Sequence, residues 1–238
     1  MKTKALILGT LSMISLFFAA CEGKKFKTMG DEDMDAVLAN DLCGALGGAT
    51  LQMQASGRIC AGWEPYNGCG ASGDSSNLSG GQLAAYLYIG TWFWIKNCIF
   101  GVPSNVHFSM GGTNEYHGDS KLEQNFGSAF QRWDVTDLDT STTTYTLNGT
   151  GLVIAGGTLN VKWRDKYFAY TDSLRYIDVK IRKTDHAIIG GGGTARIFGT
   201  IGRLSSNDFD RKATFVFNPD GSYTVTLDNG TAFTRSQF

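Results

Sequence analysis

The sequence predicts a mainly β protein, an antiparallel β-sandwich or barrel with a small, disulfide-linked helical portion on its N-terminal side. Glycine accounts for 31 of the 238 residues and proline for only 3. Because the glycines are scattered among β-branched and aromatic residues, they indicate turn-rich β structure rather than disorder. From about residue 140 onwards, short apolar runs follow one another at even spacing, as they do in antiparallel sandwiches and barrels.

The first predicted element is an amphipathic helix that begins near Asp31. Apolar residues recur at the three- and four-residue spacing of a helix, at Met34, Val37, Leu38, Leu42, Ala45 and Leu46. Carboxylates between Asp31 and Asp35 oppose the positive end of the helix dipole. Gly47 and Gly48 then predict the end of the helix.

The next stretch predicts a loop followed by a buried element. Residues 55–82 are rich in Gly, Ser and Asn, which indicates a loop. Leu83 to Ile95 contains 13 residues without a charge, fewer than the roughly 20 needed to cross a bilayer. We expect a helix beginning near Gln82, a strand through Thr91–Ile95, or both in succession. The dense aromatic residues favour a strand for the second half.

Seven short runs in the C-terminal half have the composition of β-strands. They are Thr142–Leu147, Leu152–Ala155, Thr158–Trp163, Leu174–Arg182, Ala195–Thr200, Ala213–Phe217 and Ser222–Leu227. Turn signals lie between some of them, at Asn148-Gly149, at residues 218–221 and at Asn229-Gly230. We therefore predict a helical, disulfide-rich portion over residues 33–105 and an antiparallel β portion over 106–238, or a single domain over 33–238.

The first 21 residues have the organisation of an export signal. Lys2 and Lys4 precede an apolar run from Ala5 to Phe18, and Ala19-Ala20 leads to Cys21. This segment resembles the signal of bacterial lipoproteins, in which the peptide is cut before a lipid-modified cysteine. The resemblance departs from the usual pattern at Phe18, where most lipoproteins have leucine.

The resemblance implies that residues 1–20 are removed and that residues 21–32 form a lipidated tether. The acyl chains on Cys21 would make the lipid bilayer a partner of the protein and place it in the bacterial cell envelope. Glu22 follows the cysteine, whereas aspartate at this place is the better-known signal for retention in the inner membrane. We therefore expect the outer membrane.

Four cysteines remain when Cys21 is assigned to lipid: Cys43, Cys60, Cys69 and Cys98. An even number in an exported protein predicts two disulfides, with three pairings to choose from. Short loops close most easily, so we favour Cys43–Cys60 and Cys69–Cys98. The alternative of a zinc site is disfavoured, because the chain has no Cys-x-x-Cys pair and no histidine close by.

Two groups of polar residues are weak candidates for a site. Asp134, Asp137 and Asp139 could form an irregular calcium loop, although an acidic turn is the simpler interpretation, since the EF-hand pattern is broken. His117 lies between Glu115 and Asp119, where a metal or acid–base cluster competes with a plain surface turn. We predict no firm metal site and no cofactor, and we assign no catalytic residue.

Other features argue against nucleotides and nucleic acids as partners. Leu78–Gln82 resembles the signature of ABC-transporter ATPases, but the chain lacks the phosphate loop that such enzymes need. Gly190–Gly193 suggests a nucleotide loop but is followed by a predicted strand, so we expect a flexible hairpin connection. Removing Lys2 and Lys4 from the 21 basic residues leaves 19 against 22 acidic ones, a net charge of −3. Nucleic-acid surfaces are basic.

The favoured function is a non-enzymatic binding or assembly module, anchored in the envelope through Cys21. One alternative is a surface protein that binds or degrades glycans. Its sugar platforms would be aromatic residues, although such residues more often belong to the core of a β protein; they are Trp63, Tyr66, Trp92, Trp94, Trp133 and Trp163. Another alternative is a structural subunit of an envelope complex, so an envelope protein or a glycan is the expected partner.

Overall fold

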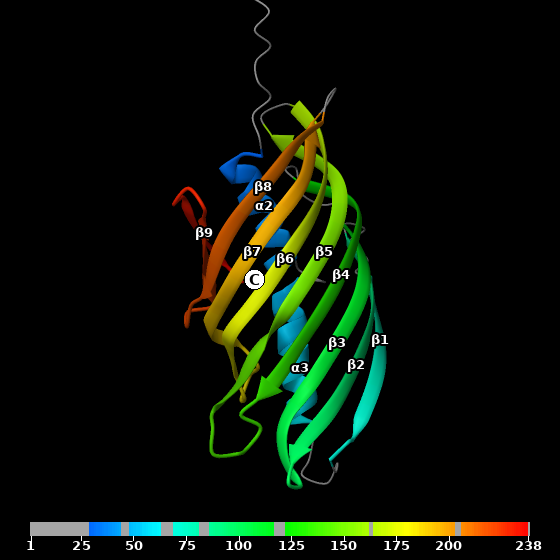
Figure 1. Cartoon of the computed structure of the whole chain (residues 1–238), viewed down its shortest axis with the longest axis vertical. Helices are drawn as coiled ribbons and strands as arrows, with labels where there is room; N and C mark the ends of the chain where they lie inside the picture. The colour runs from blue at the N-terminus through cyan, green and yellow to red at the C-terminus, as the bar shows by residue number, and fades with distance from the viewer. Residues whose placement is uncertain are drawn as a thin grey trace, which may run out of the picture.

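The computed structural model describes residues 29–43, 48–62, 69–80, 86–116, 122–161, 164–202 and 206–237. In this part of the chain two helices precede ten strands (Figure 1). The helices are α2 (Asp31–Cys43) and α3 (Ala49–Ala61). The strands are β1 (Ser72–Gly80), β2 (Tyr86–Ile99), β3 (Val102–Tyr116), β4 (Leu122–Thr136), β5 (Thr144–Val161), β6 (Arg164–Arg182), β7 (Ile188–Gly202), β8 (Ser206–Phe217), β9 (Ser222–Leu227) and β10 (Ala232–Ser236).

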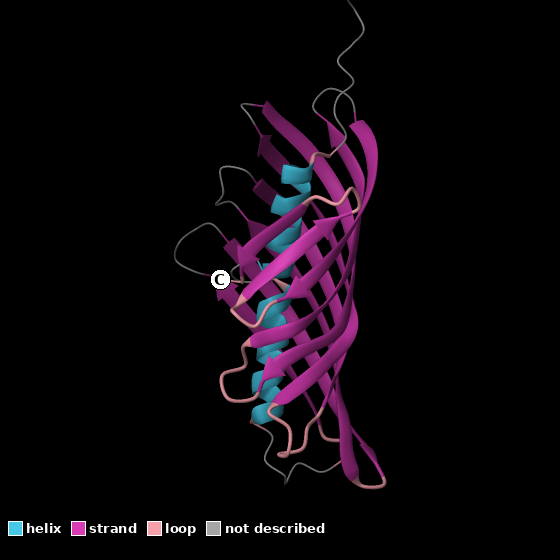
Figure 2. Cartoon of the chain, turned by 90° about the vertical axis from the view of Figure 1, so that its left-hand side faces the viewer, coloured by secondary structure: helices cyan, strands magenta, loops and turns pink. Residues whose placement is uncertain are grey.

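The ten strands form one antiparallel sheet in which each strand pairs with its neighbours in sequence. This sheet is bent into a trough around the two helices (Figure 2). The predicted mainly β, antiparallel architecture is confirmed. The two stacked sheets of a sandwich are not found among the described residues, where every strand joins the same sheet. The predicted boundary between residues 105 and 106 falls inside β3, and the sheet is continuous across it.

Two of the predicted turns are confirmed and one is wrong. Residues 218–221 join β8 to β9, and Asn229-Gly230 lies in the turn between β9 and β10. Gly221 and Gly230 have φ angles of 81° and 86°, a left-handed conformation that glycine adopts without strain. Asn148-Gly149 instead lies within β5, where the pairing with β6 shifts between Leu147 and Gly149. Asn148 and Gly149 therefore form part of a β-bulge rather than a turn.

The predicted hairpin connection at Gly190–Gly193 is also wrong, because these residues lie within β7. A Cβ atom on Gly193 would lie 2.6 Å from Cζ of Phe215 and 1.9 Å from the carbonyl oxygen of Arg175. Glycine is therefore required at the place where the Phe215 ring lies against the backbone of β7. Glycines covered by aromatic rings allow a sheet to bend sharply, and the trough depends on such bends.

The segment before the sheet contains more regular structure than its composition predicts. The helix predicted from Asp31 is confirmed as α2, and the strand predicted through Thr91–Ile95 is confirmed as part of β2. Residues 55–82, predicted as a loop, include the end of α3 and all of β1. Their polar side chains are compatible with a helix that is held by contacts with the sheet rather than by its own propensity.

The core lies between the two helices and the concave face of the sheet. The helices contribute Met34, Val37, Leu38, Leu42 and Met53, each with no exposed surface. The sheet contributes a row of aromatic rings in edge-to-face contact, with centroids 5.9 Å apart for Trp133 and Tyr176 and 6.0 Å apart for Tyr176 and Phe215. Such pairs stabilise a core beyond the burial of their surface. The concave face is thus occupied by the protein's own helices.

The disulfide Cys69–Cys98 is confirmed, with Cα atoms 5.5 Å apart. The predicted pairing of Cys43 with Cys60 is wrong, because both residues are free cysteines. Cys43 ends α2, whereas Cys60 lies 11 residues into α3, about 16 Å along the helix axis at 1.5 Å per residue. Figure 1 shows the two helices following one another along the trough, so the thiols are too far apart to pair. The helices are therefore not disulfide-linked.

The two free thiols provide a first prediction. Burial raises the pKa of Cys43 and of Cys60 to about 12, so neither forms the reactive thiolate at pH 8. We expect a maleimide to label neither residue in the folded protein, and to label two thiols per chain after unfolding without a reductant. Mass spectrometry of the labelled peptides counts them. If the unfolded protein carried no label on Cys43 and Cys60, the conclusion that both are free thiols would be contradicted.

Candidate binding surface on the outer face of the sheet

The three aspartates considered as calcium ligands lie near one another in sequence, but their side chains contact different residues. Asp134 accepts a hydrogen bond of 2.9 Å from the side chain of Asn105, and its Oδ1 lies 3.1 Å from Nδ1 of His107. Asp137 accepts a hydrogen bond from the hydroxyl of Thr146, and Asp139 caps its own turn by accepting one from the backbone N–H of Ser141. Within the described residues, no three His, Cys, Asp or Glu side chains are grouped to hold a metal ion.

Several other candidates lie outside the described residues or in the core. Cys21, His117, Asp119, Trp63, Tyr66 and Trp163 belong to the parts of the chain that the structure does not describe. Trp92 and Trp133 are buried, so they are core residues rather than sugar platforms. Of the segment Leu78–Gln82, residues 78–80 end β1.

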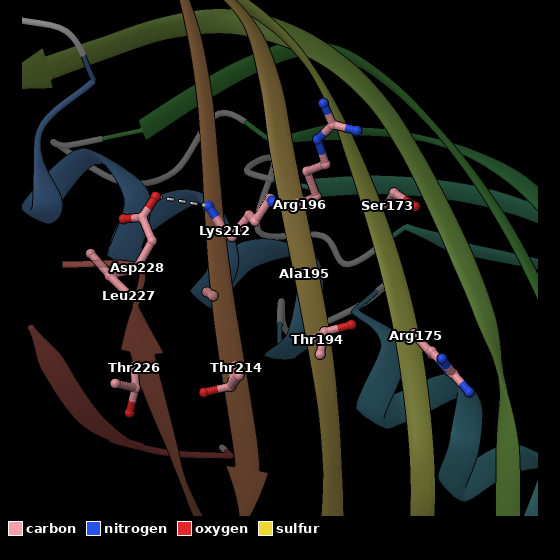
Figure 3. Close-up of a pocket in the computed structure, with 11 residues that line it drawn as sticks. Ser173, Arg175, Thr194, Ala195, Arg196, Lys212, Thr214, Thr226, Leu227 and Asp228 are labelled. Carbon is pink, nitrogen blue, oxygen red and sulfur yellow. Dashed lines mark hydrogen bonds between the residues drawn. The ribbon is translucent and has the colours of Figure 1, made fainter. Parts of the chain in front are cut away.

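The outer, convex face of the sheet holds two neighbouring depressions that meet at Ser173. The larger, of about 500 Å³, is lined by Ser173, Arg175, Thr194, Ala195, Arg196, Lys212, Ala213, Thr214, Thr226, Leu227 and Asp228 (Figure 3). The smaller, of about 410 Å³, is lined by Ser109, Met110, Phe130, Gln131, Arg132, Thr150, Gly151, Leu152 and Ser173. Together they extend over seven strands, from β3 to β9.

The strand register aligns seven polar residues in one line across these depressions, and we call this line the polar row. Each member is the direct cross-strand partner of the next: Ser109, Arg132, Thr150, Arg175, Thr194, Thr214 and Thr226. The row has two guanidinium groups, five hydroxyl groups and no carboxylate. Figure 3 shows its β6–β9 members at one level across the strands. With strands 4.7–4.9 Å apart, the row spans about 29 Å.

A second line, the mixed row, runs beside the polar row. It consists of Phe130, Leu152, Ser173, Arg196 and Lys212, which are again cross-strand partners. Arg196 and Lys212 thus lie directly opposite each other, and like charges in this position destabilise a sheet. A pair of this kind is tolerated where a neighbouring or bound anion offsets it.

Internal anions compensate only part of this positive charge. Arg196 makes a bidentate ion pair with Asp210, at 3.0 and 2.7 Å, and holds the pKa of that carboxyl below its usual value. Asp228 lies at the end of the larger depression, but Arg211 donates to it at 2.9 Å and lowers its pKa. Asp228 also accepts a hydrogen bond from the backbone N–H of Lys212 (Figure 3).

Three cations of the two rows make no direct ion pair within the described part of the chain, although Lys212 is close enough to Asp210 to help lower the pKa of that carboxyl. Arg132, Arg175 and the Lys212 ammonium make no ion pair with any residue that the structure describes, and all three side chains are exposed. The surface can therefore offer both charge and hydroxyl groups to an anionic ligand without first breaking internal contacts.

A local signal for this surface exists in the sequence. Polar and inward-facing small or apolar residues alternate at Ser173–Arg175, Thr194–Arg196 and Lys212–Thr214. The alternation indicates which side chains share one face of a strand. Which strands lie side by side, and in which register, depends on pairing across the whole sheet.

A second unusual group of ionisable residues is closed to solvent. Asp172 on β6 has no exposed surface and contacts Asp41 on α2, which accepts a 2.8 Å hydrogen bond from the hydroxyl of Tyr170. Burial raises the pKa of Asp41 to about 7, and burial together with the neighbouring carboxyl raises the pKa of Asp172 well above its ordinary value. Ionising both carboxyl groups at neutral pH is therefore unfavourable. Their position between helix and sheet indicates a structural contact.

Comparison of the chain with protein-family models, with curated proteins and with solved structures finds no match. Neither described helix is long and apolar enough to span a membrane.

Proposed function

We propose that the chain is a lipid-anchored, non-enzymatic binding module of the bacterial envelope, which presents the outer face of β3–β9 to an anionic ligand. The observation that carries this proposal is the alignment of Arg132 and Arg175 with hydroxyl side chains on strands of one continuous sheet. Strand pairing fixes the backbone positions of these residues before a ligand arrives, which reduces the backbone entropy lost on binding. The lipoprotein-like segment Met1–Cys21 supports the membrane attachment, with the outer membrane as the proposed location.

Anchoring is tested by replacing Cys21 with serine. We expect Cys21→Ser to abolish labelling by a palmitate analogue and to move the protein from the detergent phase to the aqueous phase, because the serine cannot carry the thioether-linked acyl chains that stable anchoring needs. Cys43→Ser removes a buried thiol instead and should leave both measurements unchanged. Continued labelling of Cys21→Ser would refute the anchor.

A further inference from the structure

The composition and spacing of the polar row narrow the class of ligand, provided that the proposed anion-binding function is correct. We infer that the outer face binds a linear acidic polysaccharide that lies across the strands and carries about one carboxylate or sulfate for every two sugar units.

The spacing of the positive charges supports this inference. Arg132 on β4 and Arg175 on β6 belong to the same row, with Thr150 of β5 between them. Two strand intervals separate the guanidinium-bearing positions by about 10 Å, which is close to the length of a disaccharide. A guanidinium group binds carboxylate and sulfate through paired hydrogen bonds. Each arginine can therefore meet one acidic sugar of such a repeat.

The side chains between and beside the arginines suit a sugar chain. Hydroxyl groups of Thr150, Thr194 and Thr214 can both donate and accept hydrogen bonds, as the hydroxyl groups of sugars do. In the mixed row, Phe130 is 52% exposed and Leu152 is 36% exposed, and both can cover the apolar face of a sugar ring.

Two other extended polyanions fit this surface less well. A single-stranded nucleic acid is bound by grooves that follow the phosphates with basic residues and stack the bases on aromatic side chains. The polar row instead has two cations among seven residues, and five of the seven are hydroxyl residues. Polyphosphate has a negative charge on every unit and no apolar face, so it would leave Phe130 and Leu152 without a contact.

The test measures the binding of three soluble polymers to the full-length lipoprotein in detergent micelles. The probes are hyaluronate, which has one carboxylate per disaccharide, dextran, which is neutral, and sodium polyphosphate. We expect hyaluronate to bind, dextran not to bind, and the affinity for hyaluronate to fall as salt is added, since salt screens exposed charges.

Two substitutions test whether hyaluronate binds at the polar row. Arg175→Gln removes one charged hydrogen-bonding group and should weaken hyaluronate binding at least about tenfold. Arg58→Gln is the matched control, because Arg58 is an exposed arginine on α3, away from the outer face, and the same change there should have no effect. Circular dichroism of both variants confirms that they are folded.

The outcomes distinguish a failure of the acidic-polysaccharide assignment from a failure of the proposed anion-binding function. Hyaluronate binding that is absent, or that is equal in Arg175→Gln and the unchanged protein, overturns the assignment of an acidic polysaccharide. If polyphosphate then binds through Arg175, the anion-binding function stands and only the glycan is wrong. If neither polyanion binds, the proposed binding function fails as well.

Discussion

Replacing Trp133 with alanine is expected to lower the free energy of unfolding by about 3–5 kcal/mol, the range observed when a large buried aromatic side chain is removed. Trp133 is 1% exposed and contacts α3 from β4. Its Nε1–H donates a 2.9 Å hydrogen bond to Oγ of Ser56, and the Ser56 hydroxyl in turn donates to the carbonyl oxygen of Gln52. The substitution therefore leaves a cavity and removes the hydrogen bond that attaches α3 to β4.

Urea unfolding followed by circular dichroism measures this change. The matched control is Phe130→Ala, since Phe130 lies on the same strand but faces outward and is half exposed; we expect at most a few tenths of a kcal/mol. Trp133→Phe keeps a six-membered aromatic ring but loses the N–H and part of the indole volume, so it should have an intermediate effect. A loss of less than about 1 kcal/mol for Trp133→Ala would contradict the placement of α3 inside the trough.

Replacing Asp172 with asparagine is expected to stabilise the protein by about 1–3 kcal/mol at pH 7, because it removes an ionisable group from a fully buried site. Asp172 has no exposed surface, and Asp41 is 5% exposed. An asparagine side chain is similar in shape and can donate a hydrogen bond to the carboxylate of Asp41. The substitution then removes the free-energy cost of placing two ionisable carboxyl groups next to each other in a buried site.

The pH dependence of stability distinguishes this contact from the other carboxyl groups. In the unfolded chain both aspartates titrate near the ordinary value of 3.8, whereas in the folded protein the pKa of Asp41 is raised to about 7 and that of Asp172 is raised well above its ordinary value. Their contribution to stability is therefore fully present below pH 3.8 and is lost as the pH rises through 7. The slope is about 1.4 kcal/mol per pH unit for each proton that only the folded state retains.

Exposed carboxyl groups act in the opposite direction and in another pH range. Hydrogen bonds and ion pairs lower the pKa of Asp31, Asp210 and Asp228, so these groups stabilise the protein above pH 3.8 and lose that effect as the pH falls through their lowered pKa values. The interval from pH 4 to 7 therefore reports on Asp41 and Asp172.

Thermal or urea unfolding at several pH values between 4 and 8 checks this prediction. We expect the unchanged protein to lose stability across this interval and Asp172→Asn to lose much less. Asp208→Asn makes the same chemical change at an exposed position of β8 and should leave the pH profile as it is. A profile that is flat in the unchanged protein would show that the pKa values of the two buried carboxyl groups are not raised.

Several features of this fold could be predicted because their causes are local. The helix from Asp31 follows from its apolar spacing, and the turns at residues 218–221 and 229–230 follow from glycines that adopt positive φ. The disulfide Cys69–Cys98 follows from the ease of closing a short loop, although the same rule also predicted Cys43–Cys60, which is wrong. The second helix, α3, could not be predicted because small and polar residues, such as Thr50, Gln52 and Ser56, form much of its buried face. Its burial comes from the sheet that surrounds it.

The sequence by itself determined the antiparallel β character, the first helix, one disulfide and a lipoprotein-like N-terminal segment that remains a prediction. Only the tertiary structure decided that all ten described strands form one sheet around two helices and that Arg132 and Arg175 share a row. It also brought Asp41 and Tyr170, 129 positions apart, into a hydrogen bond. The physical reason is register. Alternation shows which residues share a face of a strand, but a shift of one residue between strands would turn the row inward, and packing around the helices selects the register.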